Sequence, residues 1–204
     1  IALFLIRGLP GNPRPLLAFA VLCAAYFGAF ELLSLALIEG LGSTVLVAAG
    51  AVTGSLTAWS LVGLRPRPGG RPDPAVLGPG LVLIACLMLL AGVALAGLAG
   101  VWMIIAGAIV AGVGMGAAYP LLSSEPFSDD AAPVTVGTLI AFAETAATAW
   151  VALLAGGLYS ALHGRGWQPN RALELVFALL AVLAATAVAI SAGRRTPRRA
   201  TDAK

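Results

Sequence analysis

Apolar residues run along this chain in six stretches, each long enough to cross a lipid bilayer as a helix. An α-helix rises about 1.5 Å per residue, so about 20 apolar residues span roughly 30 Å of hydrocarbon. The predicted spans cover residues 16–38, 44–64, 76–98, 101–122, 134–159 and 172–192. Segments rich in Gly, Pro or charge separate them. The pattern predicts an all-α integral membrane protein whose six transmembrane helices form one bundle over residues 15–193.

Composition agrees with this interpretation and excludes several others. Charged residues make up 10% of the chain and hydrophobic residues 60%, whereas a soluble domain has about 25% charged residues. Cys23 and Cys86 both lie in apolar stretches, which favours packing roles over a disulfide or a metal pair. The net charge of +3 comes from residues in loops and tail, so neither a nucleic-acid partner nor a cofactor is implied.

The distribution of Lys and Arg predicts an orientation. Ten of these residues fall on one predicted side of the membrane, and only Arg165 and Arg171 fall on the other. The side rich in Lys and Arg is normally cytoplasmic, so both termini are expected in the cytoplasm, with the protein in the plasma membrane. Residues 1–14 are then expected to be the remnant of a cytoplasmic linker and residues 194–204 a basic cytoplasmic tail. Because the chain begins at Ile1, we expect it to be a fragment.

One carboxylate, Glu144, lies near the middle of the fifth span. An acid at that depth costs roughly 3 kcal/mol on insertion scales, so it indicates a water-filled path, a bundle interior or a proton relay. A carboxyl group that only hydrogen-bonds to a neighbouring helix is the structural alternative. Glu31, in the first span, is the second intramembrane acid, but it lies nearer the outer leaflet and could reach water.

Polar side chains are distributed unevenly among the spans. The third and sixth spans are almost purely apolar, whereas the first, second and fifth each carry several polar or aromatic-polar residues. This contrast predicts that the third and sixth helices face lipid while the others pack or line a cavity, as in an inverted three-plus-three repeat. The candidate proton-site or substrate-site residues are Glu144, Glu31, Tyr26 and Thr148 on these spans and Tyr119 on the fourth span.

The fourth span is rich in glycine and ends in Tyr119-Pro120. Its glycines, with Ala108 and Ala111, form two adjoining stripes of small residues, which lets a neighbouring helix come very close and slide or rock. The residues to which this packing role is assigned are Gly107, Gly112, Gly114, Gly116 and Pro120.

Four segments in order along the chain resemble the C-terminal half of a major facilitator superfamily transporter, of the actinobacterial drug-efflux type. They are YFGAFELLSLAL (26–37), AGAVTGSLTAW (49–59), GVGMGAAYPLLS (112–123) and AETAATAWVALLAGGLY (143–159). The resemblance implies that the first and fourth helices line a central cavity, the second and fifth flank it, and the third and sixth face lipid. It also implies a proton or substrate role for Glu144. The acid expected in the first helix falls at Phe30, whereas this chain has Glu31, about 100° further round.

The leading hypothesis is therefore half of a proton-coupled antiporter that exports a small, mostly apolar compound. It would rock within the bilayer against a missing N-terminal six-helix half or a second copy. Glu144 would carry the proton, and Glu31 is a second candidate for that role. A non-transporting or truncated membrane protein that acts by helix association is the alternative. An intramembrane enzyme is a third class, but it needs a nucleophile and base or clustered metal ligands. The single histidine, His163, lies in a loop, so no catalytic or metal site is predicted.

Overall fold

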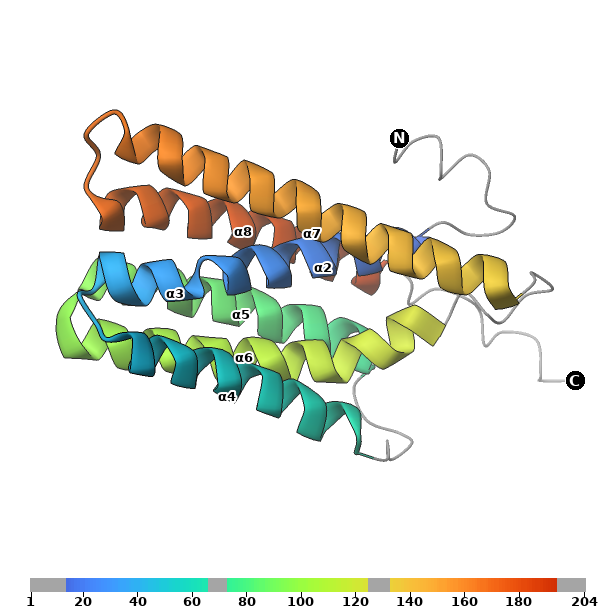
Figure 1. Ribbon diagram of the computed structural model, residues 1–204. Helices are drawn as coiled ribbons and strands as arrows, with labels where there is room; N and C mark the ends of the chain where they lie inside the picture. The colour runs from blue at the N-terminus through green and yellow to red at the C-terminus, as the bar shows by residue number, and fades with distance from the viewer. Residues whose placement is uncertain (1–13, 66–72, 125–132, 194–204) are drawn as a thin grey trace, which may run out of the picture.

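The computed structural model describes residues 14–65, 73–124 and 133–193, and over those residues every element is helical (Figure 1). The predicted linker remnant lies outside the described residues except for Arg14, and the predicted basic tail lies outside them entirely. The elements are α2 Arg14–Glu31, α3 Leu33–Leu35, the π-helical turn η1 Ala36–Gly40, α4 Val45–Gly63, α5 Pro74–Leu95, α6 Gly97–Ser124, α7 Pro133–His163 and α8 Pro169–Ala192.

Six helical stretches in the described residues are long and apolar enough to cross a membrane. The first of them, Arg14–Gly40, comprises α2, α3 and η1, and each of the other five is a single helix. The prediction of an all-α chain with six candidate spans is confirmed. The first span is not one regular helix, because α2 stops at Glu31 and Leu32 takes φ −88° and ψ −4° before α3 begins.

Short local signals start and stop the helices. The Thr44 side chain accepts a hydrogen bond from the Val47 amide at 3.4 Å, and Asp73 accepts one from the Ala75 amide at 3.0 Å. Such N-caps satisfy amide groups that have no partner within the helix. Between α5 and α6 the chain reverses at once, because Ala96 and Gly97 both adopt positive φ values, 57° and 58°.

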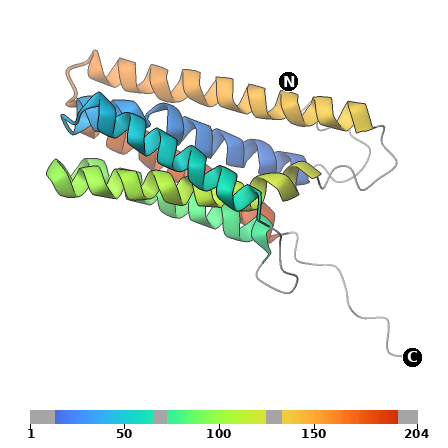
Figure 2. The same ribbon diagram turned by 60° about the horizontal axis from the view of Figure 1, so that its bottom comes forward.

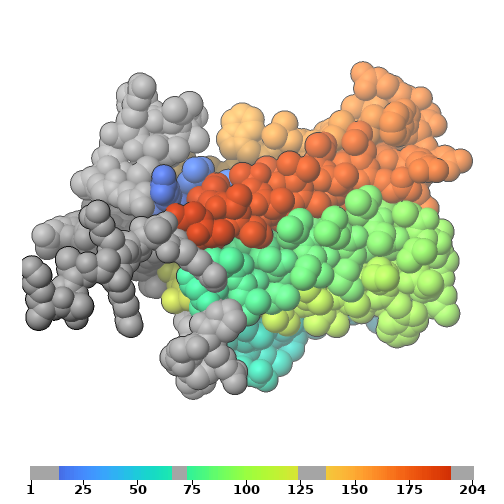
Figure 3. Space-filling view, turned by 180° about the vertical axis from the view of Figure 1, so that it is seen from behind, coloured from blue at the N-terminus to red at the C-terminus, as the bar shows by residue number. Residues whose placement is uncertain are grey.

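The packing of the helices is almost unchanged when the first three spans are exchanged with the last three. α4 and α5 both pack on α6, and their counterparts α7 and α8 both pack on α2. The pairs α2–α6 and α5–α8 are also in contact. Each helix of the first set runs opposite to its counterpart (Figures 1 and 2). Within the described helices, the contacts that lack a comparable counterpart are α7–α8, α2–α5 and those of α4 with α3 and η1. Seen from behind, α8 and α5 lie side by side and close one face of the molecule (Figure 3).

Glycines bring α6 against two helices at once. A Cβ at Gly116 would lie 2.5 Å from the Trp59 carbonyl oxygen of α4, and Gly112 lies directly against Ser55 of the same helix. On the adjoining face, a Cβ at Gly114 would lie 2.7 Å from the Gly78 carbonyl oxygen of α5. The two small-residue stripes therefore serve different neighbours, Gly112 and Gly116 facing α4, and Gly107 and Gly114 facing α5. Pro120 follows near the end of α6, where the helix bends (Figure 1).

Burial is uneven across the bundle. In the first span 56% of the residues are buried, whereas in α4 and in α7 only 17% are buried. α5 and α8 lie between these values, at 44% and 39%. In the isolated chain, the greatest exposed surface is thus on α4 and α7, the two helices that flank α2 and α6.

Candidate functional site

A hydrogen bond between α6 and α7 joins two of the residues singled out in the sequence. The Tyr119 hydroxyl donates to Glu144 Oε2 at 2.7 Å, and the pair is partly buried. This is the usual length of an O–H···O hydrogen bond, and such a bond is about twice as strong when the carboxyl group that accepts it is ionised. The carboxylate is thus held by a phenol on a neighbouring helix, 25 positions away in the sequence.

An aromatic cluster packs around the ring of Tyr119. Phe19 of α2 lies edge-on to Tyr119, with ring centroids 5.3 Å apart, and Trp59 of α4 lies 5.4 Å from it at a tilt. Trp59 also contacts Tyr26 and Phe27 of α2, at 5.5 and 6.1 Å. Offset and edge-on pairs of this kind are favourable and restrict ring motion. Three helices, α2, α4 and α6, therefore fix the phenol that binds the α7 carboxylate.

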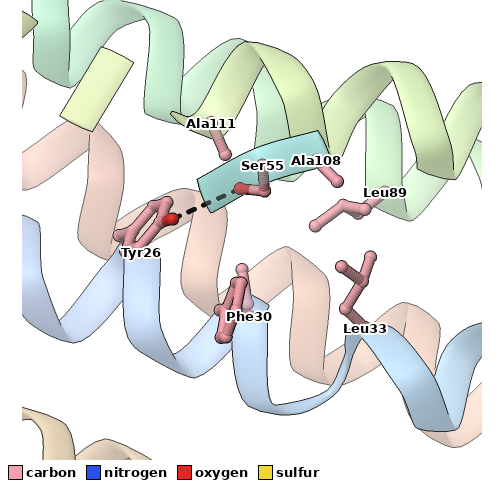
Figure 4. A pocket seen from close by; sticks show the side chains of 8 residues that line it. Tyr26, Phe30, Leu33, Ser55, Leu89, Ala108 and Ala111 are labelled. Carbon is pink, nitrogen blue, oxygen red and sulfur yellow. Dashed lines mark hydrogen bonds between the residues drawn. The ribbon is translucent and has the colours of Figure 1, made fainter. Parts of the chain in front are cut away.

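Tyr26 occupies the core rather than an open cavity. It is 1% exposed, and its hydroxyl lies 3.2 Å from Ser55 Oγ (Figure 4). The adjoining cavity of about 10 Å³ has room for a single water molecule and not for a larger substrate. It is lined by Tyr26, Ala29, Phe30, Leu33, Ser55, Leu89, Ala108 and Ala111. In this conformation Tyr26 packs α2 against α4.

Thr148 and Glu31 are placed differently from one another. Thr148 lies one turn beyond Glu144 on the same face of α7, and its buried hydroxyl has no hydrogen-bond partner within the described residues. Such a group offers a hydrogen-bond donor to a molecule that enters beside it.

Glu31 is exposed at the end of α2. It lies 12 residues, about 18 Å, beyond Phe19 along the helix, so it is not brought to the pair of Tyr119 and Glu144.

A groove of about 380 Å³ runs between α2, α7 and α8, and Ala143, the neighbour of Glu144 in the sequence, is among its lining residues. Its walls are apolar side chains, which suits an apolar ligand or a lipid chain rather than a strongly polar molecule. The lining residues are Leu16, Leu17, Ala20, Val21, Ala24, Phe142, Ala143, Ala146, Ala147, Trp150, Val151, Leu154 and Leu183.

The sequence interpretation missed a second pair of the same chemistry at the other end of α7. The Tyr159 hydroxyl donates to Glu39 Oε2 at 2.7 Å. Glu39 belongs to η1, and the Tyr159 ring stacks on the His163 ring at 5.8 Å. Neither residue was a candidate, because Glu39 falls at the predicted end of a span and the π-helical turn has no sequence signature. Within the described ranges, no group of three His, Cys, Asp or Glu side chains is placed to hold a metal ion.

The fold defines an all-helical, multi-pass membrane protein, since six of the described stretches have the length and apolar character of spanning helices. Comparison with family models, curated proteins and solved structures gives no match.

Proposed function

We propose that the chain is the C-terminal half of a proton-coupled secondary transporter of the major facilitator type. The single observation that carries this proposal is the Tyr119–Glu144 hydrogen bond, which places an intramembrane carboxylate between two spanning helices. Ionisable residues within spanning segments mark ion pathways and proton relays. A transporter needs such a group at a contact between elements that move.

This geometry couples the protonation of Glu144 to the attachment of α7 to α6. When Glu144 is ionised, Tyr119 donates a short, charge-assisted bond to it. Protonation neutralises the acceptor and roughly halves the strength of that bond. A proton that binds Glu144 therefore loosens α7 from α6, and release of the proton tightens the contact. α6 can follow because glycines form its contacts with α4 and α5.

The inverted repeat is supported by the near-symmetry of the packing. Exchange of the first three spans with the last three preserves the most extensive contacts between helices, and counterparts run in opposite directions (Figure 1). Transporters with inverted repeats bind substrate and coupling ion near the repeat interface. Here the interface lies where α2 and α6 meet, which is also where the aromatic cluster supports Tyr119.

The exposed faces of α4 and α7 fit a missing partner half. These helices carry polar side chains within apolar spans, and Thr53, Thr57 and Thr145 are exposed. Six further helices, or a second copy of this chain, would cover them and enclose a central cavity. The distribution of Lys and Arg favours the plasma membrane with both termini in the cytoplasm. The apolar groove between α2, α7 and α8 favours a small, mostly apolar substrate.

The test uses the complete product of the native gene in sealed proteoliposomes with an imposed pH gradient. Ethidium and rhodamine 6G serve as small, largely apolar fluorescent probes. Gradient-driven movement of a probe, abolished by a protonophore, is the expected result. Tyr119→Phe removes the hydrogen bond and keeps the ring, so it should weaken the dependence on the gradient, while Leu153→Ala, on the exposed side of α7 and outside the apolar groove, should not. Probe movement that ignores the gradient would contradict proton coupling.

Helix association without transport is the second candidate, and the exposed faces of α4 and α7 favour it as well. A chain that functions alone in this way should form dimers through α2, α4, α6 and α7. Cross-linking in the membrane between exposed positions such as Thr53 and Thr145 distinguishes the two functions. Cross-linked dimers of the complete gene product, with no probe transport, would favour association.

A further inference from the structure

α7 is fastened at two points by the same kind of hydrogen bond. Tyr119 donates to Glu144 in the middle part of the helix, and Tyr159, 15 residues later and near its end, donates to Glu39. The two attachments are about 22 Å apart along the helix axis. The first joins α7 to α6, and the second joins it to η1 at the end of the first span. Both donor–acceptor distances are 2.7 Å, in the range of charge-assisted bonds.

Glu39 lies on the surface of the chain at the end of the first span, whereas its partner is buried. Glu39 is exposed and Tyr159 is 6% exposed. The turn that carries Glu39 is fixed on its other side, because a Cβ at Gly40 would lie 2.9 Å from Asn170 Oδ1 and 3.1 Å from Leu173 of α8. The carboxylate is thus anchored to α8 through its backbone and to α7 through one hydrogen bond.

Few charged groups surround this carboxylate. α7 contributes Tyr159 and His163, whose rings are stacked with an interplanar angle of 4°. α8 contributes Arg171 and Glu174, which pair with each other at 2.9 Å. Arg165 lies in the connection between α7 and α8, and the described residues of α3 and α4 include no titratable side chain. The hydrogen bond from Tyr159 is therefore the direct contact that depends on the charge of Glu39.

We propose that Glu39 is a second proton-binding site, and that its protonation releases the end of α7 at which Tyr159 lies. A proton from solution adds to a carboxylate oxygen, no covalent bond breaks, and the bond from Tyr159 loses its charge assistance. In the proposed orientation this end faces outward, opposite to Glu144. The role of the site in transport rests on the proposed function, in which the two attachments of α7 would be loosened alternately. Proton binding itself needs no substrate and is tested without one.

The test measures the distance between the ends of α7 and α4 as a function of pH. Spin labels are attached at Ala161→Cys and Val45→Cys, two exposed positions. The native thiols Cys23 and Cys86 are both 0% exposed, so they do not compete for label. The complete gene product is placed in nanodiscs of phosphatidylethanolamine and phosphatidylglycerol. Pulsed electron resonance then records the distance distribution between about pH 8 and about pH 4.

Acidification should shift the wild-type distribution to longer distances. Glu39→Gln should lose this pH response and show the longer distances throughout, because the amide accepts only a neutral hydrogen bond. Tyr159→Phe, which removes the donor and leaves the acid intact, should do the same, and it supplies the test if Glu39→Gln does not fold. Glu174→Gln, at the same end of the molecule, should respond like the wild type.

A wild-type pH response in Glu39→Gln, or in Tyr159→Phe, would overturn the proposal. A distribution that does not change with pH in the wild type would overturn it too. Failure of the proposed function has a different signature: the distances would still respond to pH through Glu39, but no probe would cross proteoliposome membranes under a pH gradient.

Discussion

Replacing Gly116 by Ala perturbs the contact between α6 and α4 at a point where the neighbouring atom cannot move aside. The new Cβ would lie 2.5 Å from the carbonyl oxygen of Trp59 and 3.0 Å from Val62 Cβ. Ordinary contact begins at 3.4 Å. Because a backbone oxygen cannot rotate away, α6 must withdraw from α4 by about 0.9 Å, the difference between these distances.

This withdrawal has an energetic and a functional consequence. Overpacking costs about 1–3 kcal/mol, and the better helix propensity of Ala returns about 1 kcal/mol. We therefore expect a net loss of stability of up to about 2 kcal/mol. The same movement displaces the Trp59 ring, which lies 5.4 Å from the Tyr119 ring. Gly116→Ala should thus also slow gradient-driven probe transport.

Stability is measured by titrating the protein with dodecyl sulfate in mixed micelles and following helicity by circular dichroism. Gly50→Ala is the matched control, because Gly50 lies on the exposed side of α4 and a Cβ there meets nothing within 4 Å. This variant should gain up to about 1 kcal/mol from helix propensity alone. Equal stability of Gly116→Ala and Gly50→Ala would refute the close contact between α4 and α6.

Three further predictions concern the core and the complete protein. Ser55→Ala and Tyr26→Phe should each cost about 1–3 kcal/mol in the same titration, because each leaves the buried hydroxyl of the other residue without its partner. Phe19→Ala, at a site 0% exposed, should cost about 3–5 kcal/mol, and Phe142→Ala, at a site 46% exposed, much less. The intact mass of the native gene product should be about twice the 20.5 kDa of this chain, with six further spans.

The spans could be predicted from the sequence because length and apolar character determine them. Their ends were less predictable, since they depend on single backbone conformations. α6 begins at Gly97, before the predicted 101, because the chain reverses at Ala96 and Gly97. α7 continues past the predicted 159 to His163 and ends directly before Gly164.

The contacts of the site could be predicted only as a set of candidate residues. Glu144 and Tyr119 are each conspicuous in an apolar span, but their pairing depends on how α6 and α7 are rotated, which packing decides. The Tyr159–Glu39 pair joins residues 120 positions apart through a π-helical turn, so no local pattern signals it. Tyr26 was expected at a cavity and lies in the core, because its hydroxyl is satisfied by Ser55 of α4.

The measurement that tests the central claim most directly is the pH dependence of probe export by Glu144→Gln in the complete, correctly folded protein. The amide keeps an acceptor for Tyr119 but cannot ionise. Export by the wild type should respond to the pH gradient, and export by Glu144→Gln should be lost or independent of it, while Glu174→Gln behaves like the wild type. Export by folded Glu144→Gln with unchanged pH dependence would contradict the assignment of Glu144 as the proton carrier.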